Sequence, residues 1–220
     1  MKLSVILTVL LLIVSCTNAP SQTDKQKELT SLPPVQTTPE NGLHKAYFAS
    51  GCFWCVEAVY ESVKGVKESI SGYSGGHTEN PTYQSSNTGR TGHAEAVEIY
   101  YDPKIISFAQ LVDVYFGSQN VTQKYGQGPD RGSQYRSIIF YQNDEEKKTI
   151  EAKVKEQEAI YGEDEVAAEI MPFQKFWKGE GYHQNYEARN PSNPYIQNVS
   201  IPRLRRFQQK FPELLKKNAH

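Results

Sequence analysis

The residues best suited to chemistry form the run Gly51-Cys52-Phe53-Trp54-Cys55. A short buried strand ends at Gly51 and an amphipathic helix follows at once, so Cys52 lies at or near a helix N-terminus. Unpaired backbone N–H groups and the helix dipole stabilise an anion there, which predicts a lowered thiol pKa and a nucleophilic thiolate. The alternative is that Cys52 is a small buried hydrophobic residue, as most free cysteines are.

Two aromatic residues and a second thiol follow Cys52 directly. Phe53 and Trp54 suit the wall of a pocket for a small apolar group, because the first turn of a helix is often exposed, but they serve equally well as core. Cys55 lies one helical turn on, at about 5–6 Å between Cβ atoms. A Cys52–Cys55 disulfide would therefore be strained and easily reduced, which favours a redox role over a structural one.

A carboxylate on the predicted strand 94–101 is the second candidate for chemistry. Glu95 alternates with Val97, Ile99 and Tyr101, whereas Glu98 falls on the opposite, solvent-facing side. A carboxylate on a mostly apolar face lies either at the mouth of a pocket or near an exposed strand end. If Glu95 is buried, its pKa rises and it can act as a general acid near neutral pH.

Strands and helices alternate around these residues, which indicates a two-layer α/β or α+β domain of about 175 residues. Ser107 with Gln110, and Asn143 with Glu146, predict capping boxes at two helix starts. A polar, glycine-rich loop at 119–132 is long enough to suggest function. We expect strands at 45–49, 66–73, 94–101, 136–141 and 166–170, and helices at 52–64, 107–116, 143–160 and 202–217.

The last of these helices is basic. We expect it to pack on the domain through Leu204, Phe207 and Phe211 and to leave a solvated basic face, although contact with a lipid surface or a redox partner is an alternative. The whole chain is nearly neutral, with 24 basic and 25 acidic residues and a net charge of −1, which offers no reason to expect nucleic-acid binding.

The N-terminus has the pattern of an export signal. Lys2 precedes an apolar run at 3–14, which is too short to span a bilayer. The run ends in Ile13-Val14-Ser15-Cys16, which resembles the bacterial lipobox, in which the cysteine is lipidated. An ordinary cleavable signal is the alternative.

The domain organisation follows from this signal. We expect a lipoprotein signal peptide at 1–15, a lipidated flexible tether at 16–43 and a catalytic domain at 44–220. The protein would then be exported and lipid-anchored to a bacterial membrane, facing the periplasm or the cell exterior. Zinc is not expected, because no second cysteine pair follows Cys55 and the histidines are not spaced as ligands.

Seven short motifs occur in order along the predicted domain and together resemble the A-type peptide methionine sulfoxide reductases. The resemblance implies a ferredoxin-like, two-layer α+β fold with a mixed sheet. It implies reduction of the S epimer of methionine sulfoxide, free or in proteins, with no bound cofactor and with an external dithiol reductant such as thioredoxin or a thioredoxin-like protein. The motifs are residues 51–55 (GCFWC), 72–76 (GYSGG), 80–83 (NPTY), 92–97 (GHAEAV), 130–136 (DRGSQYR), 182–186 (YHQNY) and 190–191 (NP).

By the same resemblance, Cys52 is the attacking cysteine and Glu95 is the acid for the sulfoxide oxygen. A sulfoxide sulfur is a poor electrophile until its oxygen is protonated or strongly hydrogen-bonded, so an acid beside a thiolate is the expected arrangement. We interpret His183 as structural. The remaining implied roles are methyl binding by Phe53 and Trp54, hydrogen bonding to the oxygen by Tyr83 and Tyr135, and pocket lining by Asp130 and Tyr186.

This chain departs from the family pattern at the resolving cysteine. Many members carry one directly after a Pro-Tyr pair, but here Pro194-Tyr195 is followed by Ile196 and no cysteine lies beyond Cys55. We favour Cys55 as the resolving thiol, with attack by an outside thiol on a Cys52 sulfenic acid as the alternative.

Two other functions fit parts of the sequence. A Cys-x-x-Cys pair after a strand is typical of exported thioredoxin-like disulfide oxidoreductases, although that family usually places Trp before the first cysteine. A non-catalytic lipoprotein that binds methionine-rich or oxidised proteins through Phe53 and Trp54 is the second alternative.

Overall fold

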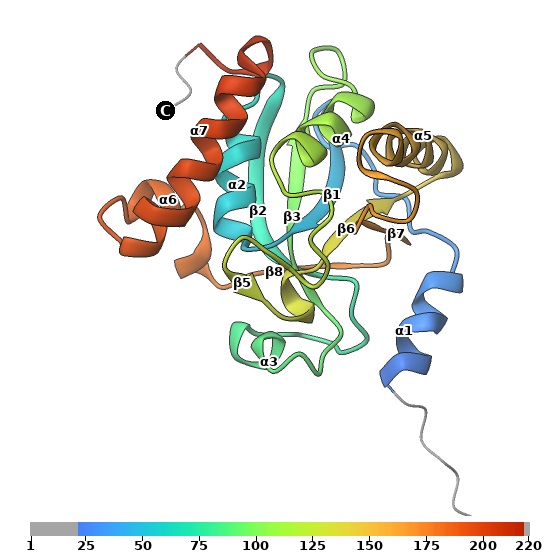
Figure 1. The fold of residues 1–220 in the computed structure, drawn as a ribbon. Coiled ribbons are helices and arrows are strands. Elements are labelled where there is room, and N and C mark those ends of the chain that lie inside the picture. The colour runs from blue at the N-terminus through green and yellow to red at the C-terminus, as the bar shows by residue number, and fades with distance from the viewer. Residues whose placement is uncertain (1–21, 218–220) are drawn as a thin grey trace, which may run out of the picture.

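The computed structural model describes residues 22–217, which form a mixed β-sheet with helices packed on it (Figure 1). The strands of the main sheet are β1 (His44–Ser50), β2 (Val66–Ser74), β3 (Ala94–Tyr101), β6 (Ser137–Tyr141), β7 (Glu169–Pro172) and β8 (Phe176–Lys178). A separate small hairpin joins β4 (Gly126–Gln127) to β5 (Asp130–Arg131). The helices are α1 (Gln22–Ser31), α2 (Phe53–Glu61), α3 (Tyr83–Asn87), α4 (Phe108–Gly117), α5 (Asp144–Tyr161), α6 (Tyr186–Arg189) and α7 (Ile201–Lys210).

The sheet has the order β7-β6-β1-β3-β2-β8. Only the β6–β7 pair is parallel within this sheet, and the other neighbours are antiparallel. This confirms an α+β sandwich built on a mixed sheet. The predicted strand at 94–101 is observed as β3, whereas the one predicted at 166–170 forms later, as β7. The short strand β8 was not predicted, because three residues are too few to show the alternation of apolar and polar side chains that indicates a strand.

The sheet has an apolar core on each face. On one face, β1 and β3 contribute Phe48, Val97 and Ile99, which pack in one cluster with residues of α2, α4 and α7, including Leu111 and Phe207. On the other face, the cluster contains Tyr47, Ala49, Ala96, Phe140 and Met171, with Leu29 of α1 packed against it. Alternate side chains of β1 and β3 therefore belong to different clusters, and only one set meets α2, α4 and α7.

The turn from β1 into α2 depends on a glycine. Gly51 has φ +79°, and a Cβ there would lie 2.4 Å from Cβ of Gln127. No other residue type fits that position without moving the loop at 119–132. Cys52 follows as the N-cap residue of α2, with φ −54° and ψ 122° and no side-chain cap. Gly51 thus brings Cys52 to the helix start, as the sequence predicts.

One of the two predicted capping boxes is complete. At the start of α4, the Ser107 side chain accepts a hydrogen bond from Gln110 N–H, and Gln110 Oε1 accepts one from Ser107 N–H. At the start of α5, Asn143 accepts from Glu146 N–H, but the Glu146 carboxylate accepts from Gln142 N–H instead of Asn143 N–H. The second box is therefore half formed.

The segment from 22 to 43, which the sequence predicts to be part of a flexible tether, makes specific contacts with the domain. Gln26 Nε2 donates to Gly75 O at 2.9 Å, and Val35 N–H donates to Phe173 O at 2.7 Å. Composition alone does not reveal these contacts, because they are polar bonds to distant backbone. The predicted signal peptide and Cys16 lie outside the described residues. No helix within 22–217 is long and apolar enough to cross a membrane.

Candidate active site

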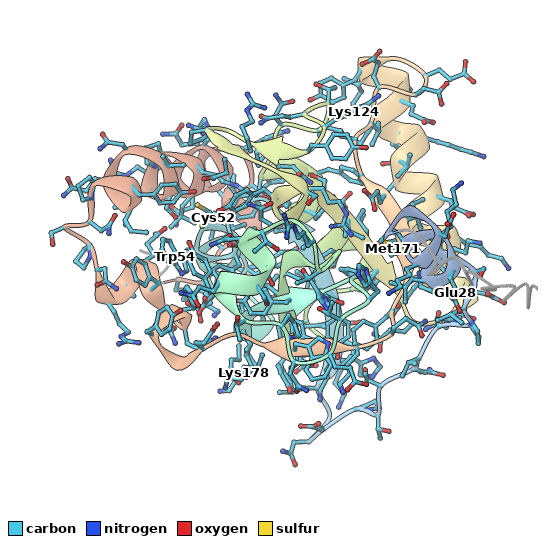
Figure 2. The ribbon with its side chains drawn as sticks, turned by 90° about the horizontal axis from the view of Figure 1, so that it is seen from below. Glu28, Cys52, Trp54, Lys124, Met171 and Lys178 are labelled. Carbon is cyan, nitrogen blue, oxygen red and sulfur yellow. The ribbon has the colours of Figure 1, made fainter. Side chains whose placement is uncertain are left out.

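The candidate nucleophile lies in the interior of the domain. Cys52 is only 6% exposed, and the backbone N–H of the next residue, Phe53, donates to Glu95 Oε2 at 3.0 Å. The first turn of α2 is therefore tied to β3 beside the thiol. Figure 2 shows Cys52 and Trp54 between the C-terminal segment and α3.

Glu95 is buried, with 2% of its surface exposed, so it does not lie at an exposed strand end. Burial raises the pKa of its carboxyl to about 8, against the lowering effect of the hydrogen bond from Phe53 N–H. Glu95 is therefore mostly protonated at neutral pH and able to give up a proton. Glu98, on the opposite face of β3, accepts a hydrogen bond from Tyr47 OH at 2.8 Å instead.

An aromatic cluster borders Cys52. Trp54 is half-buried and stacks on Tyr186, with ring centroids 3.8 Å apart and planes 9° apart. Its Nε1–H donates to His183 Nδ1 at 3.1 Å, which fixes the ring orientation. Phe53 is 1% exposed and lies 4.8 Å from the His183 ring, so the first helical turn is less exposed than the sequence suggested. Trp54 offers the accessible apolar surface and Phe53 packs into the core, while His183 holds both, in agreement with its structural interpretation.

Two predicted tyrosines from separate segments surround Glu95 and Cys52. Tyr83 begins α3 and Tyr135 ends a 3₁₀ turn at Ser133–Tyr135. Burial is the main cause that raises the pKa of both phenols. Both phenols therefore keep their protons at physiological pH and can donate hydrogen bonds to an oxygen beside Cys52.

The chemistry of the second thiol involves a residue that the sequence reasoning missed. Tyr195 OH donates to Asp130 Oδ2 at 2.6 Å and lies 3.7 Å from Cys55 Sγ. Its ring also meets Trp54 edge-on, with centroids 6.0 Å apart. The sequence analysis used the Pro194-Tyr195 pair only to note that no cysteine follows it. The same pair could have indicated that Tyr195 belongs to the site.

The two thiols have unequal surroundings. Burial raises the pKa of Cys52 well above its usual range, and a hydrogen bond with Cys55 raises it further. That hydrogen bond lowers the pKa of Cys55 to about 7, and the positive charge of Arg203 adds to the lowering. The prediction that the helix N-terminus lowers the pKa of Cys52 in the resting protein is therefore wrong, because burial outweighs it. Of the two thiols, Cys55 is therefore the more readily ionised.

Within the described residues, no group of three or more His, Cys, Asp and Glu side chains could hold a metal ion. The site places an acid, two hydroxyl donors and an apolar surface around the Cys52 thiol. A second thiol, Cys55, follows one helical turn further along α2.

Comparison with known proteins matches this arrangement to one family. The family model described as peptide methionine sulfoxide reductase covers residues 44–215. The peptide methionine sulfoxide reductase MsrA of Pasteurella multocida is 45% identical over 172 residues, which are 78% of this chain and 98% of the relative. That of Saccharolobus solfataricus is 43% identical over 171 residues, which are 78% and 96%. Among solved structures, methionine sulfoxide reductase A of Corynebacterium diphtheriae has a TM-score of 0.63 at 30% identity, over 78% of this chain and 92% of that one.

Proposed function

Since the chain belongs to the family of peptide methionine sulfoxide reductases, we propose that Cys52 attacks the sulfur of methionine-S-sulfoxide while Glu95 protonates its oxygen. The enzyme is an oxidoreductase that reduces methionine-S-sulfoxide to methionine. The observation that carries the assignment of roles is the buried, protonated Glu95, bonded to the first turn of the helix that Cys52 begins. A thioredoxin-like disulfide oxidoreductase is not favoured, because the family match spans nearly the whole predicted domain.

The attack needs Cys52 to lose a proton, and Cys55, its hydrogen-bond partner, can accept that proton. As Cys52 forms its bond to the sulfoxide sulfur, its proton passes to the Cys55 thiolate, to which it is hydrogen-bonded. Glu95 gives its proton to the oxygen, with Tyr83 and Tyr135 donating hydrogen bonds to that oxygen. Departure of methionine leaves a Cys52 sulfenic acid, a Cys55 thiol and a Glu95 carboxylate.

Substrate binding uses the aromatic cluster. The methyl group of the sulfoxide lies against Trp54, whose orientation His183 and Tyr186 hold, above the buried Phe53 ring. Asp130 acts through Tyr195, because its carboxylate accepts a hydrogen bond from the Tyr195 hydroxyl.

Resolution is the step in which Cys55 acts as a nucleophile. Cys55 attacks the sulfur of the Cys52 sulfenic acid, its proton leaves with the hydroxyl group as water, and a Cys52–Cys55 disulfide forms. An external dithiol, a thioredoxin or thioredoxin-like protein, then reduces this disulfide by exchange, and no bound cofactor takes part.

Mass spectrometry of the full chain after one turnover with methionine-S-sulfoxide, without reductant, tests this sequence. We expect one methionine per enzyme and a loss of two hydrogens that maps to Cys52–Cys55. A Cys55→Ser variant is expected to release the same single methionine, more slowly because the base is lost, and to keep the sulfenic acid on Cys52. Its steady-state rate with a dithiol should fall at least about 10-fold, because an adjacent thiol acts at a far higher effective concentration. A wild-type sulfenic acid with Cys55 free would assign resolution to an outside thiol.

Tyr195 is expected to assist resolution. In Tyr195→Phe the hydrogen bonds to Asp130 and Cys55 are lost, so disulfide formation should slow by about 3- to 10-fold, the effect of a modest hydrogen bond. Rapid quenching with an alkylating reagent measures that rate. Tyr161→Phe, at an exposed position on α5, is the control. Slower methionine release with unchanged disulfide formation would move Tyr195 to the substrate step.

Two wider proposals complete the assignment. We classify the core as ferredoxin-like, because its strands have the order β6-β1-β3-β2 and α2 and α4 lie in the connections.

We also propose that the enzyme is exported and anchored to a bacterial membrane by lipid on Cys16, where it repairs oxidised methionine in proteins. The lipobox-like run that ends at Cys16 supports this location.

A further inference from the structure

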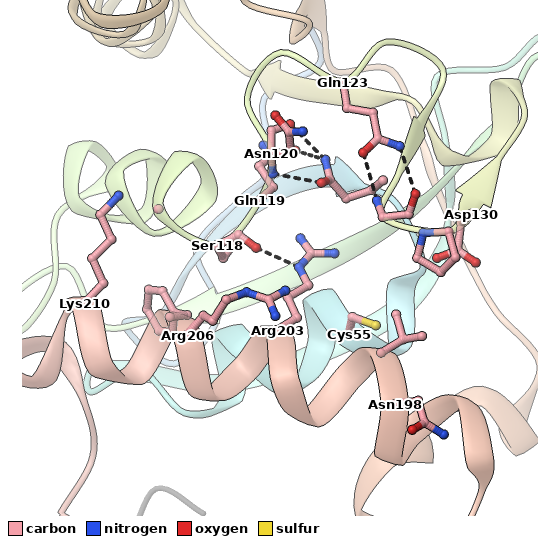
Figure 3. A pocket seen from close by; sticks show the side chains of 16 residues that line it. Cys55, Ser118, Gln119, Asn120, Gln123, Asp130, Asn198, Arg203, Arg206 and Lys210 are labelled. Carbon is pink, nitrogen blue, oxygen red and sulfur yellow. Dashed lines mark hydrogen bonds between the residues drawn. The ribbon is translucent and has the colours of Figure 1, made fainter.

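A cavity of about 710 Å³ reaches the thiol pair at Cys55 (Figure 3). Cys55 lines it, whereas Cys52, Glu95 and the two predicted tyrosines do not. Its walls come from the end of α4, the loop at 119–130, the turn at Ile196–Ser200 and α7. A volume of this size is ordinary for a small-molecule site. The cavity therefore reaches the resolving thiol and Asp130 but does not include Cys52, Glu95, Tyr83 or Tyr135.

The inner wall carries a buried cation. Arg203 is 7% exposed and donates to Ser118 O at 2.7 Å, Ser50 O at 2.8 Å and Ser50 Oγ at 2.7 Å. All these acceptors are neutral, and Arg203 forms no ion pair with any residue between 22 and 217. A buried charge without a counter-ion is costly, so this position favours an anion nearby. A Cys55 thiolate is one such anion, and the charge of Arg203 lowers the pKa of that thiol.

Two exposed cations continue the positive wall. Arg206 and Lys210 follow Arg203 at helical spacing on α7 and line the same cavity. Lys210 lies over the Phe211 ring, and neither residue forms an ion pair with the described part of the chain. Asp130 is the single acidic residue among those that line the cavity, and it is bound by Tyr195. The cavity thus has a surplus of positive charge around a thiol.

We propose that this cavity binds a small thiol that carries carboxylate groups, and that this thiol, in addition to the protein dithiol, reduces the Cys52–Cys55 disulfide by attack on Cys55. The proposal rests on the proposed role of Cys55 as the resolving thiol. Cys55 is 2% exposed, so a reductant that attacks its sulfur must enter the cavity, and a small molecule can do so. Arg206 and Lys210 would bind its carboxylates.

The exchange balances in two steps. The thiolate of the first small thiol bonds to Cys55 Sγ, the Cys52–Cys55 bond breaks, and Cys52 leaves as a thiolate that takes up a proton. A second small thiolate then attacks the small-molecule sulfur of the mixed disulfide and releases Cys55 as a thiolate. Two thiols become one small disulfide, and both enzyme cysteines are reduced.

The test uses the full chain, oxidised by one turnover, and three probes of similar size: 3-mercaptopropionate, 2-mercaptoethanol and cysteamine. With rates expressed per thiolate, the anionic probe should reduce the enzyme about 10-fold faster than the cationic one, and added salt should narrow the difference. The mixed disulfide should map to Cys55. In Arg206→Glu/Lys210→Glu the preference should disappear or invert.

A matched charge control separates this site from a general effect of net charge. Arg205→Glu/Lys217→Glu makes the same change at exposed positions that do not line the cavity, and it should keep the wild-type preference. Equal rates for the three probes, or a mixed disulfide on Cys52, would overturn the proposal while leaving methionine release and disulfide formation intact. Failure of the Cys52–Cys55 disulfide to form would instead overturn the resolving role of Cys55, and this proposal with it.

Discussion

Replacement of Cys52 by serine is expected to lower the turnover of methionine-S-sulfoxide by on the order of 10⁴-fold or more, the size of loss seen when a nucleophile is removed. Serine matches the buried N-cap position in size, so α2 should keep its place against β3. The serine hydroxyl has no sulfur atom, so it cannot take the sulfoxide oxygen to form a sulfenic acid. Binding of the substrate methyl group depends on Trp54 and should change little. Single-turnover release of methionine, with the substrate affinity measured separately, checks both expectations.

The unequal thiols make this experiment informative in either outcome. Cys55 has the lower pKa of the pair, at about 7, so it is the more ionised thiol near neutral pH. Cys52 nevertheless lies beside Glu95, Tyr83 and Tyr135, and geometry decides which sulfur attacks. If Cys52→Ser still released one methionine per enzyme, Cys55 would be the nucleophile and our assignment would be wrong.

The candidate nucleophile and acid were predictable because short-range patterns fix their positions. A strand, a glycine and a helix start place Cys52, and the alternation along 94–101 places Glu95 on the face that packs against α2. Those arguments need only neighbouring residues. The first turn of α2 is more buried than a local argument predicts, since Phe53 packs against His183, which is far along the chain.

Other features of the site depend on contacts that no local pattern reports. Tyr195 lies 140 positions after Cys55, and Arg203 lies 153 positions after Ser50, so both reach the thiols only because the C-terminal segment returns across α2. The helix N-terminus was visible in the sequence. The burial that raises the pKa of Cys52 and the charge of Arg203 that lowers the pKa of Cys55 were not.

Glu95→Gln is the second large effect that we expect. Glutamine keeps the size of the side chain and an oxygen that accepts the Phe53 N–H bond, but its amide cannot transfer a proton. The rate of methionine formation should fall by about 10²- to 10⁴-fold, the usual contribution of general acid catalysis. Glu98→Gln, on the opposite face of β3, is the matched control and should keep nearly the wild-type rate.

The pH profile distinguishes proton transfer from simple hydrogen bonding. The pKa of Glu95 is raised to about 8, so its acid form is present below that pH and is lost above it. The wild-type rate of methionine formation should therefore fall as the pH rises through about 8. In Glu95→Gln this fall should vanish, and the small remaining rate should rise with pH as the thiol pair ionises, because no acid is left to lose. A variant that kept the wild-type fall above pH 8 would place the titrating acid elsewhere, and Glu95 would then act only as a polar contact to the helix start.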